Sequence, residues 1–238
     1  MDMKQEKRKY ISAAFALMLI PALLTALCPA PLFAIDVLYV GDSHSAGPFG
    51  VKMDELIRSL PWVKLDFYAV CGSVYSWWLN GKETPCGYFF RDKEGAESRG
   101  KNGPTPLFKK LLKKDSPEIV IVEMGANYWD YPEKKAVKEM RKMAKKIRAS
   151  GAQCYWITTP DSAKIRAHIP GIMEYTRKAV SPYCRIFDST AVTSYPDGMG
   201  DGLHYAAEPL VPIADRWAEA VFTDLQPVIE EIYKKTLP

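Results

Sequence analysis

The fold is decided by one stretch of the sequence, Val37-Leu38-Tyr39-Val40-Gly41-Asp42-Ser43-His44-Ser45. Its first half is an apolar run of β-type residues, and its second half is small and polar. A buried strand that ends at Gly-Asp-Ser brings the Ser43 hydroxyl to the carboxyl edge of a sheet. Ligands bind at that edge in open α/β sheets. The stretch therefore predicts a reactive serine, provided that a base and an oxyanion site join it.

Outward from this stretch, strand-like and helix-like segments alternate along the chain. Further strands are expected at 63–70, 118–124, 153–158 and 185–187, and helices at 53–60, 106–114, 132–150, 171–180 and 210–235. This alternation predicts an α/β fold, a three-layer α/β/α sandwich with a central, mainly parallel sheet. Residues 73–103 show no clean period, and long irregular segments inside compact domains are more often functional than idle.

The first 34 residues have the pattern of a targeting segment. Basic residues within 4–9 precede an apolar run over 11–27, and small residues and prolines follow up to Ala34. This order predicts a signal peptide cleaved near Ala30 or Ala34, with an uncleaved N-terminal membrane anchor as the alternative. Both interpretations put residues 35–238, which are expected to form one domain, outside the cytoplasm, either periplasmic or secreted.

Charge and length exclude some classes of partner. The 238 residues carry a formal net charge of +4, with both signs interspersed. No dense basic stripe with interleaved aromatic residues is present, so nucleic acid is not an expected partner. The lysine-rich runs are interpreted as solvated helix faces. The length and the lack of a linker predict one domain. A monomer is expected.

Four cysteines follow the targeting segment, namely Cys71, Cys86, Cys154 and Cys184. An even number in an exported protein suggests disulfides, although four cysteines allow three pairings. Local geometry favours Cys71–Cys86 and Cys154–Cys184, because the second pair would lie at the starts of neighbouring strands. Free buried thiols are the alternative.

Polar residues without an obvious packing role follow the ends of strands or lie in loops. They form four groups, at 41–45, 71–73, 125–128 and 201–204. The carboxyl ends of parallel strands meet at one edge of a sheet, so the first three groups should converge there.

In these four groups the sequence resembles the SGNH hydrolases, also called GDSL-type esterases. The resemblance covers residues 35 to about 205. It consists of Gly-Asp-Ser-x-Ser at 41–45, a glycine after the second strand at 72, Gly-x-Asn at 125–127 and Asp-x-x-His at 201–204. Each motif is short, but all four occur in the family's order. The resemblance implies the family's flavodoxin-like fold.

The resemblance also implies roles for individual residues. Ser43 would be the nucleophile, His204 its general base and Asp201 the residue that orients His204. The backbone N–H groups of Ser43 and Gly72 and the side-chain amide of Asn127 would form the oxyanion hole. In the family an aspartate often follows the asparagine, whereas this chain has Tyr128. The hydrogen bonding near Asn127 must therefore differ.

Other residues compete for two of these roles. His44 and His168 are the remaining histidines, but only His204 has the Asp-x-x-His setting. Asp197 is an alternative partner for the histidine, although its offset from His204 is less natural than that of Asp201.

These observations predict an exported serine esterase that works through an acyl-enzyme, without metal or cofactor. No pair of cysteines or histidines has metal-ligand spacing. Localisation and the resemblance favour removal of O-acetyl groups from a cell-envelope polysaccharide such as peptidoglycan. The alternatives are a lipid esterase or thioesterase of the same family and a non-catalytic carbohydrate-binding protein on this scaffold.

Three aromatic residues are candidates for contact with the substrate. Trp77 and Trp78 could stack on sugar rings or could instead serve core packing, and Tyr128 could line the cleft.

Overall fold

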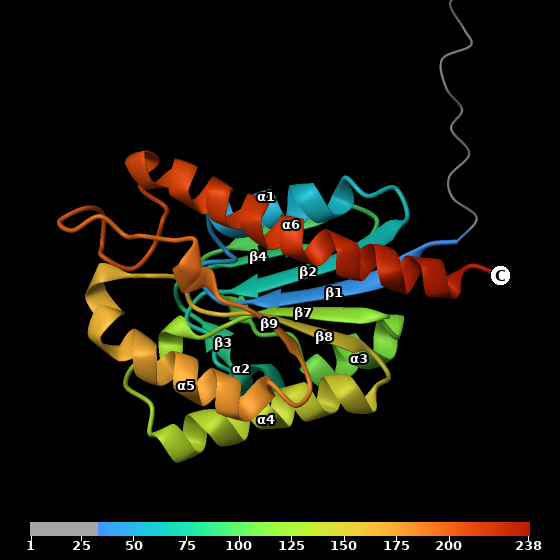
Figure 1. Cartoon of the computed structure of the whole chain (residues 1–238), viewed down its shortest axis with the longest axis horizontal. Helices are drawn as coiled ribbons and strands as arrows, with labels where there is room; N and C mark the ends of the chain where they lie inside the picture. Colours follow the sequence, from blue (N-terminus) through green and yellow to red (C-terminus); the bar gives the residue numbers. More distant parts are fainter. Residues whose placement is uncertain (1–32) are drawn as a thin grey trace, which may run out of the picture. The chain divides into compact units, whose positions relative to one another are not determined.

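Strand β1 (Ile35–Gly41) lies inside a seven-stranded sheet with the order β5-β4-β2-β1-β7-β8-β9 (Figure 1). It pairs in parallel with β2 (Val63–Val70) and β7 (Ile119–Glu123), and β8 (Gln153–Ile157) and β9 (Arg185–Phe187) continue the parallel pairing. The computed structural model describes residues 33–238. The predicted targeting segment, 1–34, lies outside the described residues except for its last two.

Both faces of the sheet are covered by helices, because side chains of successive strand residues point to opposite faces and both sets are apolar. Val37 and Tyr39 pack on the side of α1 (Pro48–Arg58) and α6 (Val211–Thr236). Leu38 and Val40 pack on the other side. That side holds α2 (Tyr75–Asn80), α3 (Phe108–Asp115), α4 (Glu133–Ala149) and α5 (Ile169–Val180) (Figure 1). The three-layer α/β/α sandwich is confirmed.

The segment 73–103 is more regular than its sequence indicates. It contains α2 and a hairpin of β4 (Tyr88–Arg91) and β5 (Glu97–Gly100), in which β4 pairs antiparallel with β2. Two further short strands, β3 (Glu83–Thr84) and β6 (Gly103–Pro104), form a separate pair. The expectation of an irregular segment is wrong here, since strands of two to four residues are too short to show a period of two.

The order of the parallel strands determines where a site can form. The parallel strands lie in the order β2-β1-β7-β8-β9. Counted along the chain, this is the order 2-1-3-4-5 of flavodoxin-like folds. The chain therefore changes direction across the sheet between β1 and β7, and the crevice at such a switch point is where ligands bind. Ser43 follows β1, and Asn127 lies in the 3₁₀ helix Ala126–Tyr128 after β7.

Two disulfides link the cysteines as expected, Cys71 with Cys86 and Cys154 with Cys184. The Cα atoms are 5.5 Å apart in the first pair and 4.5 Å apart in the second. Cys154 is the second residue of β8 and Cys184 directly precedes β9, so the two neighbouring strands begin beside each other. Within residues 33–238, no helix is long and apolar enough to cross a membrane.

Candidate active site

The turn after β1 holds Ser43 at the carboxyl edge of the sheet. The Asp42 N–H donates to the carbonyl of Glu123 at 3.0 Å, and the Ala46 N–H donates to the Asp42 carbonyl at 3.1 Å. Helix α1 then begins with Pro48, which suits the first helical position because it has no N–H to satisfy. The helix approaches the turn so closely that a Cβ on Gly50 would lie 1.7 Å from the Ser45 carbonyl oxygen. Only glycine fits there.

Ser43, His204 and Asp201 form a continuous hydrogen-bonded chain. The Nε2 atom of His204 lies 2.9 Å from the Ser43 Oγ, and its Nδ1 atom lies 2.6 Å from an Asp201 carboxylate oxygen. Ser43 and His204 are 161 positions apart in the sequence. This is the order of contacts that a serine nucleophile, a base and an orienting carboxylate require.

The Asp201 carboxylate is held ionised in this chain. Its Oδ1 atom accepts the backbone N–H groups of Leu203 and His204 at 2.9 and 2.7 Å. Partial burial raises the pKa of Asp201, but these donors and the His204 ring outweigh burial and lower the pKa to about 2. A permanent negative charge beside Nδ1 favours the tautomer in which Nε2 is free to accept the Ser43 proton.

The loop that carries Asp201 and His204 is fixed by Tyr195. The single proton of the Tyr195 hydroxyl is shared between the carbonyls of Met199 and His204, at 3.1 and 3.3 Å, and the hydroxyl oxygen accepts the Gly202 N–H at 3.2 Å. The loop is also joined to the segment after β8, since the Lys164 N–H donates to the Gly202 carbonyl at 2.8 Å. The turn thus keeps its shape through contacts with buried groups, although its surface is exposed.

The competing carboxylate, Asp197, has a different partner. It pairs with the Arg166 guanidinium at 2.7 Å. The same guanidinium forms a bidentate pair with Asp161 at 3.0 Å, and Asp161 in turn accepts the Tyr195 N–H at 2.7 Å. Asp161 and Asp197 therefore stabilise the loop through Arg166, and neither contacts the His204 ring.

The other two histidines lie outside the hydrogen-bonded chain. His168 is exposed, and its ring lies 5.7 Å from that of Trp129. His44 is buried beside the site, with its ring 5.5 Å from the His204 ring and 5.8 Å from Trp217. Burial, with a smaller contribution from His204, lowers the pKa of His44 to about 3. His44 is therefore neutral at ordinary pH.

Two backbone donors at the site have no partner. Within the described residues, the N–H groups of Ser43 and Gly72 make no hydrogen bond. Gly72 has φ of +75°, a conformation that glycine adopts without strain. A Cβ at this position would also meet the Trp77 ring at 3.4 Å and the Cys86 sulfur at 3.5 Å. The backbone conformation therefore favours glycine after β2, whereas these contacts are ordinary van der Waals distances that would admit a Cβ.

The third expected donor, Asn127, is already engaged. Its Nδ2 atom donates to the Asp42 Oδ2 and to the Ser73 carbonyl, both at 3.2 Å. Asn127 therefore lies between the turn after β1 and the turn after β2, as the convergence of strand ends predicts. Both of these bonds are long, so one can be exchanged for a ligand acceptor at small cost.

Beside Ser43 lies a pair of fully buried carboxyl groups, Asp42 and Glu123, which we call the buried carboxyl pair. Asp42 accepts the His44 N–H at 3.0 Å and the Asn127 amide. Glu123 accepts the Ser45 hydroxyl at 2.7 Å, and Ser45 also bonds the Tyr39 hydroxyl at 2.8 Å. The pair links the Ser43 turn to the strand that precedes Asn127.

The buried carboxyl pair favours protonation. Burial raises the pKa of Asp42 to about 6, although the His44 N–H and the His204 ring lower it in part. Burial and then the Asp42 charge raise the pKa of Glu123 well above its ordinary value. Two like charges in one dry site are unfavourable, so Glu123 keeps its proton while Asp42 ionises first.

No expectation from the sequence included these two carboxyls as functional residues. The available signal was Glu123 itself, a carboxylate at the end of the otherwise apolar strand Ile119–Glu123 and two residues before Gly125.

A cleft of about 220 Å³ opens beside Ser43 and His204. Its walls come from the start of α1, the first disulfide and the end of the His204 loop, namely His44, Ala46, Gly47, Pro48, Phe49, Cys71, Cys86, Tyr205 and Ala206. Ligand pockets for drug-sized molecules usually measure about 300–1,000 Å³. This cleft therefore suits a short group.

Two of the three aromatic candidates cannot contact a substrate. Trp78 and Tyr128 are 0% and 1% exposed, and both belong to the core beneath α2 and α4. The Trp78 Nε1 donates to Ser73, and the Tyr128 hydroxyl accepts the Tyr75 N–H at 2.9 Å. Substrate contact through Trp78 or Tyr128 is therefore corrected to core packing. Trp77 is half-buried beside Gly72 and remains accessible.

The part of the chain from 33 to 238 contains no cluster of three or more His, Cys, Asp or Glu residues that could hold a metal ion.

Comparison with solved structures agrees with this architecture. The chain is similar to TesA, with a TM-score of 0.55 and 18% identity over 81% of this chain and 98% of TesA. A peptidoglycan O-acetylesterase matches with a TM-score of 0.53 and 12% identity over 85% of this chain and 93% of that one. The esterase EstA from Pseudoalteromonas sp., in a structure inhibited by monoethylphosphonate, matches with a TM-score of 0.51 and 16% identity over 80% and 98% of the two chains.

No protein-family model matches the sequence, and no curated protein matches it. The structural likeness shows that the chain has the α/β fold of the SGNH hydrolases.

Proposed function

We propose that this protein with the SGNH-hydrolase fold is a serine esterase that works through an acyl-enzyme on Ser43. One observation carries the proposal, the bond of 2.9 Å between the Ser43 Oγ and the His204 Nε2, continued by the bond of 2.6 Å from Nδ1 to Asp201. A serine hydroxyl becomes a useful nucleophile when an adjacent imidazole can take its proton.

In the first step, the Ser43 oxygen attacks the ester carbonyl carbon while His204 Nε2 takes the hydroxyl proton. The imidazolium that forms is stabilised by the Asp201 carboxylate. As negative charge develops on the carbonyl oxygen, this oxygen accepts hydrogen bonds from the free N–H groups of Ser43 and Gly72. The Asn127 amide joins them by exchanging its long bond to the Ser73 carbonyl for the oxyanion.

The tetrahedral intermediate then collapses. His204 returns its proton to the departing alcohol oxygen as the carbon–oxygen bond breaks, and the acyl group stays on Ser43. A water molecule next gives a proton to His204 and attacks the acyl carbon. Collapse of the second intermediate releases the carboxylic acid and returns the proton to Ser43.

For the substrate we propose O-linked acetyl groups on a cell-envelope polysaccharide such as peptidoglycan. The cleft of about 220 Å³ has room for a short acyl group. The predicted targeting segment and the two disulfides are compatible with an exported enzyme. Trp77, half-buried beside Gly72, could support the sugar ring that carries the ester. Similarity to a peptidoglycan O-acetylesterase agrees with this choice.

The alternatives from the sequence differ in what the cleft must hold. A lipid esterase or thioesterase needs a trough for a long acyl chain, which the cleft of about 220 Å³ beside Ser43 does not by itself provide. A non-catalytic carbohydrate-binding protein has no need for the hydrogen-bonded chain from Ser43 to Asp201.

The esterase is tested with the p-nitrophenyl esters of acetate, butyrate and octanoate. We expect hydrolysis of the acetate by the purified protein and none above background by Ser43→Ala. Ser59→Ala, on an exposed residue at the end of α1, is the matched control and should retain activity. Equal inactivity of the wild type and Ser43→Ala would disprove the esterase, and rates that rise with chain length would favour the lipid esterase.

The polymer is tested by acetate release from O-acetylated peptidoglycan and from acetylated xylan, measured side by side. We expect faster release from peptidoglycan. Faster release of acetate from xylan would be consistent with the proposed esterase activity but would reject peptidoglycan as the substrate.

A further inference from the structure

Helix α4 concentrates positive charge on the side of the sheet that carries α2, α3 and α5. It has eight basic and two acidic residues, whereas the formal net charge of the whole chain is only +4. The helix therefore holds more net positive charge than the entire protein. Its apolar residues, including Met140, Ala144 and Ile147, are buried against the sheet, so the charge lies on the outer face.

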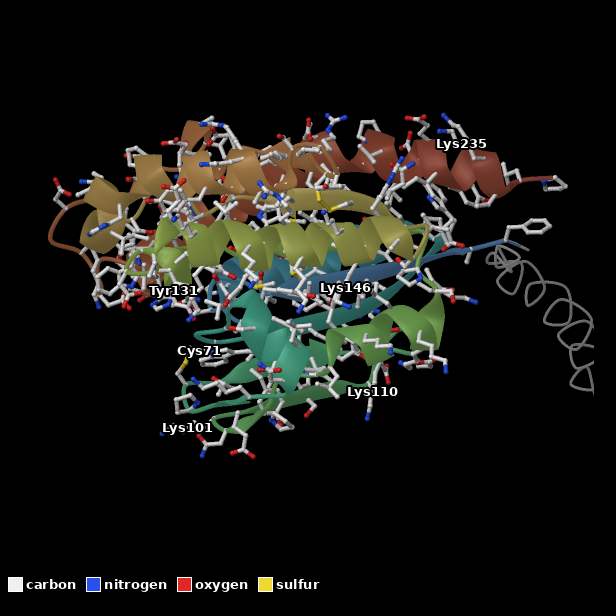
Figure 2. All side chains as sticks on the ribbon, turned by 90° about the horizontal axis from the view of Figure 1, so that it is seen from below. Cys71, Lys101, Lys110, Tyr131, Lys146 and Lys235 are labelled. Atoms are coloured by element: carbon white, nitrogen blue, oxygen red, sulfur yellow. A yellow bond between two sulfur atoms is a disulfide. The ribbon has the colours of Figure 1, made fainter. Side chains whose placement is uncertain are left out.

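The basic side chains surround a groove of about 660 Å³, which we call the α4 groove. Six cations of α4 line it, namely Lys134, Lys138, Arg141, Lys142, Lys145 and Lys146. Figure 2 shows this side of the molecule, with Lys146 on α4 and Lys110 on α3. The groove is larger than the cleft at Ser43, and none of its residues belongs to that cleft.

Most of this charge is not neutralised by the protein. The one acidic residue in the groove, Glu133, pairs with Lys178 of α5 at 2.7 Å. Among the described residues, none of the five α4 lysines in the groove has an acidic partner within ion-pair distance. The one carboxylate that lines the groove is thus already paired with a cation.

This arrangement is unfavourable for the helix itself. Lys134, Lys138, Lys142 and Lys146 are spaced by four residues, so they repel each other along one face. Lys134 and Lys135 also lie in the first turn, where the helix dipole disfavours cations. This row of lysines destabilises the isolated helix α4, so a role in binding an anion explains the row better than a role in stabilising the fold.

The shape and chemistry of the groove restrict its partner. Successive cations of the row are one helical turn apart, and the row from Lys134 to Lys146 is about 18 Å long. A repeating anion on a linear chain matches a linear row. The lysine stems, Val137 and Ala149 provide apolar surface, which suits the apolar faces of sugar rings. No aromatic residue lines the groove, so the base-stacking platform of single-stranded nucleic acid binding is absent from it.

We propose that the α4 groove binds a linear anionic polysaccharide, with its carboxylate, phosphate or sulfate groups along the row of lysines. This goes beyond the proposed esterase and does not require it, because the groove and the cleft share no residue. An interfacial membrane-binding helix would present large apolar side chains beside its cations. The large apolar side chains exposed within 33–238 are Phe33, Trp129, Val192 and Leu237, and none belongs to α4.

The test measures binding of fluorescent dextran sulfate to the full-length protein over a series of salt concentrations. The variant is the triple substitution Lys138→Gln, Lys142→Gln and Lys145→Gln. The matched control removes the same charge from the opposite side of the sheet through Lys52→Gln, Lys234→Gln and Lys235→Gln on α1 and α6. Figure 2 shows Lys235 at the end of α6, away from α4.

We expect the α4 variant to bind dextran sulfate at least about tenfold more weakly. The plot of the logarithm of its association constant against the logarithm of the salt concentration should have a slope smaller in magnitude by about 2 to 3. The control should bind within about twofold of the wild type. Hydrolysis of p-nitrophenyl acetate should be equal in all three proteins, so a failed groove and a failed esterase give different results. Equal losses in the two triple variants, or no loss in the α4 variant, would overturn the proposal.

Two further probes separate other partners. Vesicles of phosphatidylcholine and phosphatidylglycerol in equal parts represent an anionic membrane, and a single-stranded oligonucleotide of similar charge represents nucleic acid. We expect both to bind more weakly than dextran sulfate. Tighter binding of either probe, with the same dependence on the α4 lysines, would reject the polysaccharide.

Discussion

Two aspartates flank Ser43, the proposed nucleophile, and their surroundings are opposite. Asp201, in the loop before α6, has a side chain that is 54% exposed, and its pKa is lowered to about 2. Asp42, in the turn after β1, is fully buried, and its pKa is raised to about 6. Asp201 accepts hydrogen bonds from two backbone N–H groups and is hydrogen-bonded to the His204 ring. Asp42 instead lies beside another carboxyl group, that of Glu123.

The difference shows how environment divides the work between identical side chains. In the proposed mechanism Asp201 must be ionised to stabilise an imidazolium, and hydrogen-bond donors in a solvent-facing turn favour its ionised form. Asp42 has a structural acceptor role, because its oxygens hold the His44 N–H and the Asn127 amide. The exposed aspartate is therefore proposed to act in catalysis, and the buried one to position the groups around it.

The largest expected effect on activity comes from a substitution of the exposed aspartate, Asp201. We expect Asp201→Asn to lower kcat for p-nitrophenyl acetate by about 10⁴-fold, because the neutral amide no longer fixes the tautomer of His204. The free energy of unfolding should change by less than about 1 kcal/mol, since the side chain is more than half exposed. Steady-state kinetics and urea unfolding measure both quantities.

Asp197→Asn is the control, since Asp197 pairs with Arg166 and does not contact the His204 ring. We expect its kcat to stay within about threefold of the wild type. A loss as large as that of Asp201→Asn would mean that the orienting carboxylate has been assigned wrongly.

The next largest effect concerns Asn127, which Asp42 positions. Asn127→Ala should lower kcat by about 10²–10³-fold with a small change in KM, as expected for a donor that acts mainly in the transition state. Asn102→Ala, on an exposed residue, is the matched control and should leave kcat unchanged. A change confined to KM would show that Asn127 binds the ground state instead.

On the buried side, the effect should be on stability. Glu123→Ala removes the acceptor of the Ser45 hydroxyl at 2.7 Å and leaves a cavity. We expect it to lower the free energy of unfolding by about 2–4 kcal/mol in urea unfolding. Glu123→Gln keeps an acceptor and a donor at the same position, so it should recover more than half of that loss. Equal losses in the two variants would argue against a hydrogen-bonding role for Glu123.

The smallest effect is on the pH dependence of stability. The pKa of Asp42 is about 6 when folded and about 3.9 when unfolded, so the folded state binds more protons between these values. Asp42 therefore lowers stability as pH rises from about 4 to 6, by at most about 1.4 kcal/mol per pH unit. The lowered pKa of Asp201 has the opposite sign, because its stabilisation is present above about pH 4 and is lost toward pH 2.

Urea unfolding at a series of pH values measures this difference. Subtracting the curve of Asp42→Asn from that of the wild type should give a difference that falls between pH 4 and 6. The same subtraction with Asp201→Asn should give a difference that rises from pH 2 to 4. Two differences of the same sign would contradict the contrast between the two sites.

Part of the fold was predictable because its signals are local. The apolar run before Gly41, the strand Val63–Val70 and the carboxyl-edge positions of Gly72 and Asn127 follow from patterns within about ten residues. The disulfides were predictable because Cys154 and Cys184 lie where adjacent parallel strands begin. In contrast, the hairpin of β4 and β5 is stabilised by pairing with β2 and has too few residues for a visible period.

The sequence by itself determined the alternation of strands and helices, the four polar motifs and the identity of a serine, a histidine and an aspartate that could react together. Only the tertiary structure decided which groups meet. It brought Ser43 and His204 to 2.9 Å across 161 residues, paired Asp197 with Arg166 and buried Trp78 and Tyr128 in the core. It also set Glu123 against Asp42 in a dry site. The physical reason is that burial and pairing depend on neighbours distant in the chain, and these neighbours give two aspartates on either side of Ser43 opposite pKa shifts.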